Sequence, residues 1–477
     1  MIRVFVEGHN NYYGISDLLR AFYGRTVENR DDHFVFCESG PDIDIVSLVK
    51  DGMIRTFIKG KEDLWVKEYE DIFGDRGLEE KREVKRQLYF LLFKIENRSF
   101  PWGSLTGIRP TIVAREEKTS RNLQERYMVR ADKADLCIKT SENEERILET
   151  QGAGDMNVYI GVPFCPSRCA YCSFISKDIT HHMKLLPSYA DSLAREIATI
   201  GPKLSCVSAI YMGGGTPTVF DGRDFRKVLE SMAMNIGYDK GCEITVEAGR
   251  PDTIDQYKLE TMRELGIKRI CINPQTMSDE TLKRYNRRHT VQDTVKVYEM
   301  ARKLGFDTIN MDLIAGLNPE EPEELLYSLE RLFELGPENI TIHTLYKKRA
   351  SNLTRQGVLG GEAAADGLMD DRLDRVLTKA YEMVEAKGYE PYYMYRQKDT
   401  SHGLENVGFA LKGTECLYNV SMMSDRRNVI SFGAGGMSKR IFDNGRLERF
   451  PTNKDVICYM RDLERICEDK AGFFGLD

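Results

Sequence analysis

The sequence predicts an α/β protein built on a partial (β/α)6 barrel, with an α+β domain before the barrel and an α/β extension after it. Two patterns support this prediction. From Asn157 onward, short apolar runs alternate with amphipathic stretches, as they do where crossover helices join parallel strands. Cysteines and polar residues gather where these runs end, and barrels of this type keep their chemistry at that end of the strands.

Six strand-helix units can be marked in the barrel segment. Six units rather than the eight of a complete barrel predict a barrel that stays open along one side. The expected strands are Val158 to Phe164, Ala209 to Met212, Glu243 to Glu247, Arg269 to Ile272, Thr308 to Leu313 and Ile340 to Leu345.

Amphipathic stretches between these strands predict the crossover helices. A glycine closes several of them, at Gly201, Gly266, Gly305 and Gly336, and glycine is typical of helix ends. A further helix, Arg372 to Ala386, is closed by Gly388. The expected barrel helices include Tyr189 to Ile200, Ile254 to Leu265, Val291 to Leu304 and Pro322 to Leu335.

The segments on either side of the barrel have a different pattern. We expect an N-terminal accessory domain over residues 1–150, the barrel over residues 151–350, and a C-terminal extension over residues 351–477 that covers the barrel mouth. In the extension, residues 357–367 predict a loop and Asp455 to Glu468 predicts a helix. The expected elements of the first domain are strands at Met1 to Glu7, His33 to Glu38, Ile43 to Lys50 and Ile54 to Lys59, and a helix at Glu79 to Phe93.

Composition argues against several classes of protein. The formal net charge is −7 and charges of both signs are intermixed, so general nucleic-acid binding, which needs a basic surface, is disfavoured. There is no apolar secretory leader and no long uncharged apolar run, and the cysteine total, eleven, is odd. We therefore expect a soluble cytoplasmic protein without a membrane span, and a monomer.

Three of the cysteines form one short run, Cys165-Pro-Ser-Arg-Cys169-Ala-Tyr-Cys172, directly after the first barrel strand. Thiolates with this spacing can each bind one iron of a four-iron four-sulfur (4Fe-4S) cluster, which leaves the fourth iron without a protein ligand. An open iron indicates an exchangeable ligand, for which S-adenosyl-L-methionine (SAM) is the obvious candidate. Zinc is the alternative, but zinc sites favour a second C-x2-C pair, which the other cysteines do not supply.

Glycines and an acidic residue follow the next two strands. Gly214, Gly215 and Thr216 belong to the run Gly213-Gly-Gly-Thr-Pro-Thr218, and glycines let a ligand approach the backbone closely. A tight turn is the alternative for this run. Glu247 ends the third strand, where its carboxylate can accept hydrogen bonds from the two ribose hydroxyls of an adenosyl group. A surface glutamate is the alternative there.

The later strands also end in polar residues. Gln275 follows the fourth strand and offers amide hydrogen bonds. Arg287 lies in Asn286-Arg-Arg-His289 and can clamp a carboxylate with two parallel hydrogen bonds, although either Arg287 or Arg288 could instead be exposed. Asp312 interrupts an apolar strand, and a buried carboxylate needs a partner such as a ligand hydroxyl or a cation.

Taken in order, these motifs resemble those of radical SAM enzymes and, more narrowly, of oxygen-independent coproporphyrinogen III oxidases. The closest likeness is to the HemZ-type branch, the coproporphyrinogen dehydrogenases with a long N-terminal extension. The resemblance covers nearly the whole chain and is most specific from Val158 to Leu317. The motifs that carry it are Tyr159 to Cys172, Gly213 to Thr218, the Glu247 strand, Pro274-Gln275, Asn286 to His289, Asn310 to Ile314, Pro101 to Pro110, Tyr393 to Lys398 and Leu404 to Phe409.

The resemblance implies a role for each matching residue. Members of the family can hold two SAM molecules, and Met437 ends a Gly433-Ala-Gly-Gly-Met437 loop that resembles the one enclosing the second. Tyr159 and Arg287 would lie at the catalytic centre, although core packing is the alternative for Tyr159. The implied cluster ligands are Cys165, Cys169 and Cys172, and the implied SAM contacts are Tyr159, Tyr171, Gly214, Gly215, Thr216, Glu247, Gln275, Arg287 and Asp312.

The activity that the resemblance implies is oxidative decarboxylation in anaerobic haem biosynthesis. Two propionates of coproporphyrinogen III would become vinyl groups, giving protoporphyrinogen IX, with a flavodoxin- or ferredoxin-type protein as electron donor. A tetrapyrrole substrate with four carboxylates needs cations, although an exposed salt-bridging role is the alternative for each candidate. The candidates are Lys347 to Arg349, Arg396, Lys398, Arg426 and Arg427.

One position departs from the better characterised oxidases. They carry a histidine between the tyrosine and the proline of the first strand, where this chain has Gly161. Any role of that histidine in proton delivery or hydrogen bonding therefore does not carry over. Two other functions stay open at this point: a haem-binding chaperone that keeps the cluster motif, and a radical SAM methyltransferase acting on a tetrapyrrole.

Overall fold

The computed structural model describes most of the chain, in two compact units. One unit consists of Met1–Ile138, Gln356–Asp371 and Tyr395–Glu405, and the other of Lys139–Arg355, Arg372–Met394 and Asn406–Asp477. The loop expected at residues 357–367 lies outside the described residues, and the boundaries at residues 150 and 350 stay predictions. The described residues are 2–23, 28–29, 33–36, 43–51, 53–59, 76–152, 154–172, 177–318, 321–345, 371–397 and 403–476.

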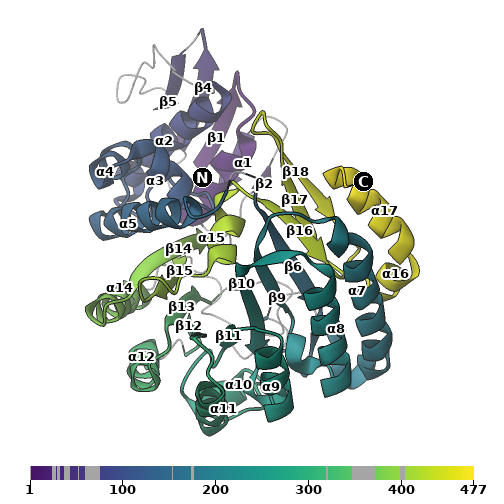
Figure 1. Ribbon diagram of the computed structural model, residues 1–477. Coiled ribbons are helices and arrows are strands. Elements are labelled where there is room, and N and C mark those ends of the chain that lie inside the picture. The colour runs from purple at the N-terminus through teal and green to yellow at the C-terminus, as the bar shows by residue number, and fades with distance from the viewer. Residues whose placement is uncertain are drawn as a thin grey trace. The chain divides into compact units, whose positions relative to one another are not determined.

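Six parallel strands form the centre of the larger unit (Figure 1). Each is hydrogen-bonded to the next in chain order, so the six predicted strands are confirmed. The first strand pairs on its outer edge with β16 and the last with β15, so the six strands form an open, partial barrel, as predicted. The strands are β6 (Met156–Val162), β9 (Val207–Gly214), β10 (Tyr238–Gly249), β11 (Arg269–Ile272), β12 (Thr308–Ala315) and β13 (Asn339–Thr344).

Strands from the C-terminal third extend the sheet at both edges. β16 (Asn428–Phe432) runs parallel to β6, and β17 (Met437–Ile441) and β18 (Leu447–Pro451) follow it antiparallel. At the other edge, β15 (Glu405–Ala410) runs antiparallel to β13, with β14 (Glu390–Arg396) beside it. Because β16 places residues near position 430 beside the strand that leads to the cysteines, it brings the Gly433 loop to the same edge.

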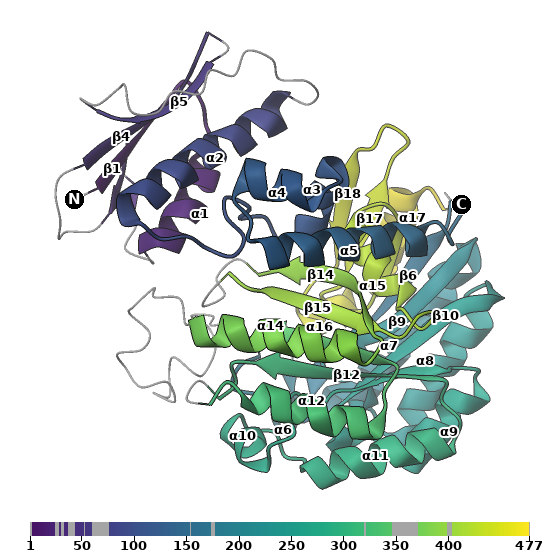
Figure 2. The ribbon, with the colours of Figure 1, turned by 90° about the vertical axis from the view of Figure 1, so that its left-hand side faces the viewer.

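Helices cover the outer face of these strands (Figure 2). The predicted barrel helices are present, and Gly266, Gly305, Gly336 and Gly388 follow helices in the left-handed conformation expected of a closing glycine. Gly201 differs, since its φ of −52° continues the chain into a 3-10 turn. The helices are α7 (Leu186–Ile200), α8 (Gly222–Asn235), α9 (Gln256–Glu264), α11 (Val291–Lys303), α12 (Glu324–Leu335) and α14 (Asp371–Ala386).

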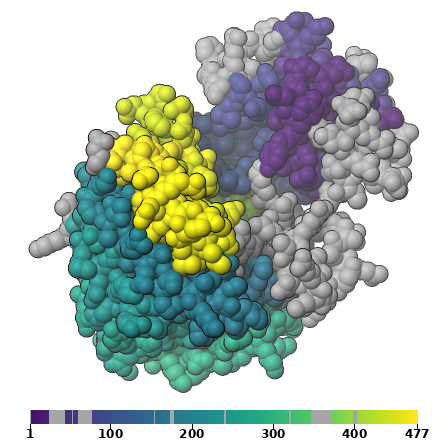
Figure 3. Space-filling model, turned by 90° about the vertical axis from the view of Figure 1, so that its right-hand side faces the viewer, coloured from purple at the N-terminus to yellow at the C-terminus, as the bar shows by residue number. Residues whose placement is uncertain are grey.

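Two helical regions of this unit illustrate differences from the sequence prediction. Helix α8 was not predicted, although Asp221 caps it by accepting a hydrogen bond from the Asp224 N–H. The single helix expected at residues 455–468 is wrong: α16 (Val456–Arg461) ends at Arg461, Asp462 follows as its cap, and α17 (Leu463–Phe474) begins after it. Both C-terminal helices pack on α7, and Figure 3 shows this segment in yellow against the teal barrel. Shorter elements of this unit are β7 (Phe164–Cys165), β8 (Lys177–Asp178), α6 (Ile179–His182), α10 (Asp279–Arg284) and α15 (Leu417–Ser424).

The smaller unit has its own sheet and core. Its strands follow the order β2-β3-β1-β4-β5, and α1 and α2 pack on the sheet through residues such as Leu18, Ile45 and Leu88. Among the described helices, none is long and apolar enough to cross a membrane. The elements are β1 (Ile2–Glu7), β2 (Glu28–Asn29), β3 (His33–Phe36), β4 (Ile43–Lys50), β5 (Met53–Ile58), α1 (Tyr12–Tyr23), α2 (Arg76–Glu96), α3 (Pro110–Glu117), α4 (Ser120–Tyr127) and α5 (Ala131–Leu148), whose last turns belong to the larger unit.

Candidate functional site

The three clustered cysteines lie on the loop that leaves the carboxyl end of β6. Cys165 ends the short strand β7, and Cys169 and Cys172 follow on the next turn. Cys169 is buried, whereas Cys165 and Cys172 are partly exposed. The Cys172 N–H donates to the Cys169 carbonyl at 3.1 Å, and the Ala170 N–H donates to the Tyr285 carbonyl at 3.2 Å. The loop is therefore fixed both internally and to the segment after α10.

The glycine run at the end of β9 lies directly against this loop. A Cβ added to Gly215 would lie 2.5 Å from the Phe164 carbonyl oxygen and 2.9 Å from the Cys165 sulfur. Gly214 has a φ of +117°, which disfavours any other residue. The Thr216 hydroxyl lies 3.7 Å from the Cys165 sulfur. The run therefore does more than turn the chain, because it brings the backbone of β9 against the cysteine loop.

Glu247 on β10 and Asp312 on β12 form an acidic pair beside the glycine run. Burial and the negative charge of Asp312 raise the pKa of Glu247 to about 8, although its side chain keeps some surface open to solvent. The Gly214 N–H donates to Glu247 Oε2 at 3.3 Å. Asp312 accepts from Asn310 Nδ2 at 2.7 Å and has His343 Nε2 at 3.6 Å. Glu247 is therefore not an ordinary surface glutamate.

Three tyrosine rings stack beside Glu247. Tyr159 on β6 lies 6.4 Å from Tyr211 on β9 and 6.1 Å from Tyr418 on α15, measured between ring centroids. Burial, and then the charge of Glu247, raise the pKa of Tyr159. The ring of Tyr159 therefore packs in the interior, while its position close to Glu247 keeps it at the predicted site.

Gln275 is joined to the acidic pair through the backbone. It has a φ of +74°, which is unusual outside glycine, and its N–H donates to the Asp312 carbonyl at 2.9 Å. The Ile314 N–H donates in turn to the Gln275 carbonyl at 2.9 Å. This exchange fixes the turn after β11 against β12.

Arg287 is buried and lies at the cysteine loop, whereas Arg288 is exposed. One terminal nitrogen of Arg287, Nη1, donates to the Tyr171 hydroxyl at 2.9 Å and lies 3.9 Å from the Cys169 sulfur. The other donates to the Asn273 carbonyl at 2.7 Å. The Tyr171 side chain thus forms part of the same group, and burial raises its pKa.

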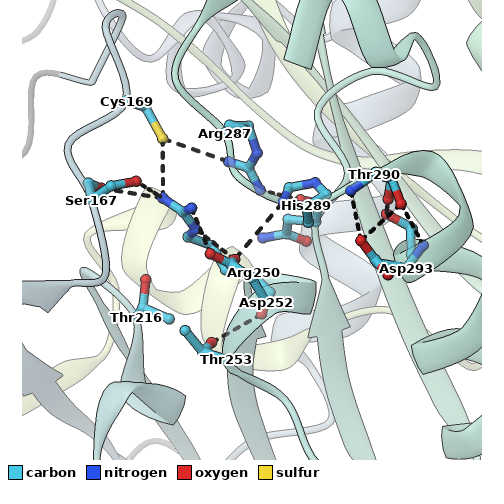
Figure 4. Close-up of polar contacts among 12 residues, drawn as sticks. Ser167, Cys169, Thr216, Arg250, Asp252, Thr253, Arg287, His289, Thr290 and Asp293 are labelled. Atoms are coloured by element: carbon cyan, nitrogen blue, oxygen red, sulfur yellow. Dashed lines mark hydrogen bonds and ion pairs between the residues drawn. The ribbon is translucent and has the colours of Figure 1, made fainter. Parts of the chain in front are cut away.

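A second arginine, which sequence reasoning missed, reaches the same sulfur (Figure 4). Arg250 follows the glycine at the end of β10 and donates to the Ser167 hydroxyl at 2.9 Å, with its Nη1 3.7 Å from the Cys169 sulfur. Asp252 holds the far edge of Arg250, and His289 Nδ1 lies 3.8 Å from Asp252. Burial and the charge of Arg287 lower the pKa of His289 to about 3, so this imidazole is neutral.

Several buried polar atoms of this group have no hydrogen-bond partner among the described residues. They are Arg287 Nε, the Asn273 amide oxygen and both ring nitrogens of His289. Buried polar atoms are ordinarily hydrogen-bonded, so unpartnered ones beside a thiol loop fit a polar ligand. Among the described residues, no three His, Cys, Asp or Glu side chains form a group that could hold a metal ion, so cluster binding by the three thiols stays a prediction.

The chain is similar to several known proteins. Residues 159–329 match the radical SAM superfamily. HemZ of Bacillus subtilis, described as an oxygen-independent coproporphyrinogen-III oxidase-like protein, is 36% identical over 391 residues, which cover 78% of this chain and 76% of HemZ. The chain belongs to the HemZ family of radical SAM proteins. The resemblance seen in the motifs is therefore confirmed.

More distant relatives of this HemZ-family protein include a protein with another role. The haem chaperone HemW of Escherichia coli is 27% identical over 297 residues, which cover 62% of this chain and 72% of HemW. The crystal structure of coproporphyrinogen III oxidase from Escherichia coli superposes with a TM-score of 0.53 at 19% identity, over 68% of this chain and 72% of the oxidase. That likeness confirms the fold. Radical SAM proteins use a 4Fe-4S cluster and SAM, so the cofactor prediction is confirmed for the family.

Three of the arginines expected to bind substrate have partners within the protein. Arg396 donates to the Gly403 carbonyl at 2.8 Å, Arg426 pairs with Glu145 at 2.5 Å, and Arg427 donates to two backbone carbonyls. Met437, by contrast, begins β17 with 40% of its surface exposed, so it is open to a ligand. The other expected cations, Lys347 to Arg349 and Lys398, lie outside the described residues.

Proposed function

We propose that this HemZ-family protein is an oxygen-independent coproporphyrinogen III oxidase, which converts two propionates of coproporphyrinogen III into vinyl groups. The observation that carries the proposal is the contact between Gly215 and the cysteine loop, together with the raised pKa of Glu247 one strand away. Together these features bring a thiol, a glycine backbone without side chains and a carboxylate with a raised pKa into one region. A nucleotide bound at a cluster would require such a region. The name of HemZ, an oxidase-like protein, supports the choice of substrate.

The chemistry of the site residues suits the two cofactors, since three thiolates with this spacing can each bind one iron. Cys165, Cys169 and Cys172 would hold the cluster, and the predicted SAM contacts are Gly214, Gly215, Thr216, Glu247, Gln275, Arg287, Asp312, Tyr159 and Tyr171. Met437 would help to enclose a second SAM. When bound and reduced, the pair would supply a radical able to remove hydrogen from an unactivated carbon, which is what a propionate β-carbon requires. Carbon dioxide would then leave, and the remaining electron would pass to a one-electron acceptor. The chain itself binds and orients the substrate and excludes water from the site.

The packing around Gly161 leaves little room for a larger side chain such as the histidine of other oxidases. A Cβ at this position would lie 3.2 Å from the Tyr159 ring and 3.3 Å from the Phe432 carbonyl oxygen, and the Tyr189 hydroxyl donates to the Gly161 carbonyl at 2.7 Å. A larger side chain would therefore have to displace its neighbours. We infer that the reaction in this protein uses no proton donor at position 161.

An anaerobic product assay tests the proposal. Reconstituted protein, reduced by dithionite or by a flavodoxin, should convert SAM to 5′-deoxyadenosine and remove two carboxyl groups from coproporphyrinogen III, as mass spectrometry would show. Cys169→Ala should abolish both products, because it removes one cluster ligand. Cys458→Ala, which removes a partly exposed thiol on α16, should leave both unchanged.

Other outcomes would favour the other two functions. Unchanged porphyrinogen together with a methylated product would identify a methyltransferase. Unchanged porphyrinogen together with stoichiometric binding in a spectral titration with haem would identify a chaperone, which is the role named for HemW. Either outcome would refute the oxidase proposal while leaving the family assignment intact.

A further inference from the structure

Arg250 is the feature of the site that the predicted cofactor contacts do not explain. It lies at the carboxyl end of β10, directly after Gly249, and only 4% of its surface is exposed. Its Nη1 donates to both the hydroxyl and the carbonyl of Ser167, at 2.9 and 3.2 Å, and lies 3.7 Å from the Cys169 sulfur. One guanidinium nitrogen thus contacts the cysteine loop at Ser167 and at the sulfur of Cys169.

The other edge of the same guanidinium is fixed as firmly. Arg250 Nε donates to Asp252 Oδ1 at 2.9 Å and Nη2 donates to Oδ2 at 2.8 Å, which is the two-bond geometry that arginine makes with a carboxylate. A planar group held along both edges has little freedom to turn away. Its Nη1 therefore stays directed at Ser167 and Cys169 (Figure 4).

The charge around Cys169 is positive on balance. Arg250 and Arg287 both direct a nitrogen at its sulfur, at 3.7 and 3.9 Å, while Asp252 supplies one negative charge on the side of Arg250 away from the sulfur. His289 is neutral and adds none. In a buried site such charges are screened far less than they are in water.

We propose that Arg250 is a positioning residue that fixes the Ser167 to Cys169 segment and raises the reduction potential of a cluster held by Cys169. Reduction adds an electron to the cluster, so nearby positive charge and N–H donors at a ligand sulfur stabilise the reduced state. The inference rests on the proposed function only in requiring that a cluster is bound. It predicts that SAM cleavage can be driven by a weaker reductant than it could without Arg250.

A redox titration of the loaded protein, followed by electron paramagnetic resonance, tests this proposal. Arg250→Gln should lower the ratio of reduced to oxidised cluster at least tenfold at a fixed solution potential, which for one electron is a shift of about −59 mV. Asp252→Asn should shift the midpoint in the opposite direction, because it removes a negative charge. A merely structural role would not produce shifts of opposite sign.

Arg226→Gln is the matched control. Arg226 is an arginine of α8 that also donates to a carboxylate, Glu264, at 2.7 Å, but on the outer surface of the barrel. Its loss should leave the midpoint unchanged. A midpoint for Arg250→Gln equal to that of the wild type would overturn the proposal.

If the Arg250→Gln protein holds no cluster, the midpoint potential of the Asp252→Asn protein tests the proposal. A midpoint above the wild-type value supports the proposal, and one at or below that value refutes it. Absence of a cluster from the wild-type protein would refute the proposed function instead. The two failures are therefore distinguishable.

Discussion

The raised pKa of Glu247 makes SAM binding dependent on pH in a way that can be calculated. An isolated glutamate has a pKa near 4.5, and burial beside Asp312 raises that of Glu247 to about 8. At pH 7 about nine-tenths of the free protein therefore carries a proton on this carboxyl. Ribose hydroxyls that donate to the carboxylate favour its ionised form, so SAM binding should expel that proton.

The size and direction of the effect follow from these values. SAM affinity should rise about tenfold from pH 6 to pH 7, about tenfold again by pH 9, and level off above pH 8 to 9. In the free protein, the same raised pKa makes the free energy of unfolding fall as the pH rises, whereas SAM affinity increases. Because the unfolded chain ionises near 4.5 and the folded one near 8, the contribution of Glu247 to stability is present below pH 4.5 and is lost as the pH rises to 8.

Anaerobic isothermal titration of the loaded protein measures the proton directly. Runs at pH 7 in two buffers with different ionisation enthalpies should give a release that is about 0.9 proton larger for the wild type than for Glu247→Gln. The difference between the two proteins removes any proton lost by SAM itself. Glu264→Gln, which changes an exposed glutamate on α9, should behave as the wild type. Equal proton release by wild type and Glu247→Gln would refute the assigned contact with the ribose.

Two further predictions concern the glycine run at the end of β9 and the packing of α17 on α7. Gly215→Ala should lower the iron content severalfold, because its Cβ would lie 2.5 Å from the Phe164 carbonyl; Gly472→Ala, whose Cβ would meet nothing within 4 Å, should not change it. Lys470→Met should lower the free energy of unfolding by about 3–5 kcal/mol in urea denaturation, because it leaves the fully buried Glu196 carboxylate without its cation. Adding Glu196→Gln should restore part of this loss, and a single mutant as stable as the wild type would contradict the reasoning.

The strand ends could be predicted from the sequence because their signals are local. The thiol spacing around Cys169 and the apolar strand before Glu247 each lie within a few residues, and parallel strands bring their carboxyl ends to one edge. Helix α8 has a comparable local signal, the cap Asp221 followed by Phe225 and Val228 at helical spacing.

The rest of the site depends on contacts between distant parts of the chain. Arg250 reaches Cys169 across 81 residues, and no local pattern around Arg250 indicates which way it points. Tyr418 stacks on Tyr159 because β16 pairs with β6, and a pairing of that kind has no local signature. His343 falls near Asp312 only because β12 and β13 are adjacent.

Cys165, Cys169 and Cys172 are predicted to hold a 4Fe-4S cluster whose fourth iron binds SAM. The most direct measurement is pulsed electron-nuclear resonance on the anaerobically reduced protein with SAM labelled by 15N at the amine and 17O at the carboxylate. Both labels should show hyperfine coupling to the cluster. A cluster without such coupling, or zinc in place of iron in anaerobically purified protein, would contradict this prediction.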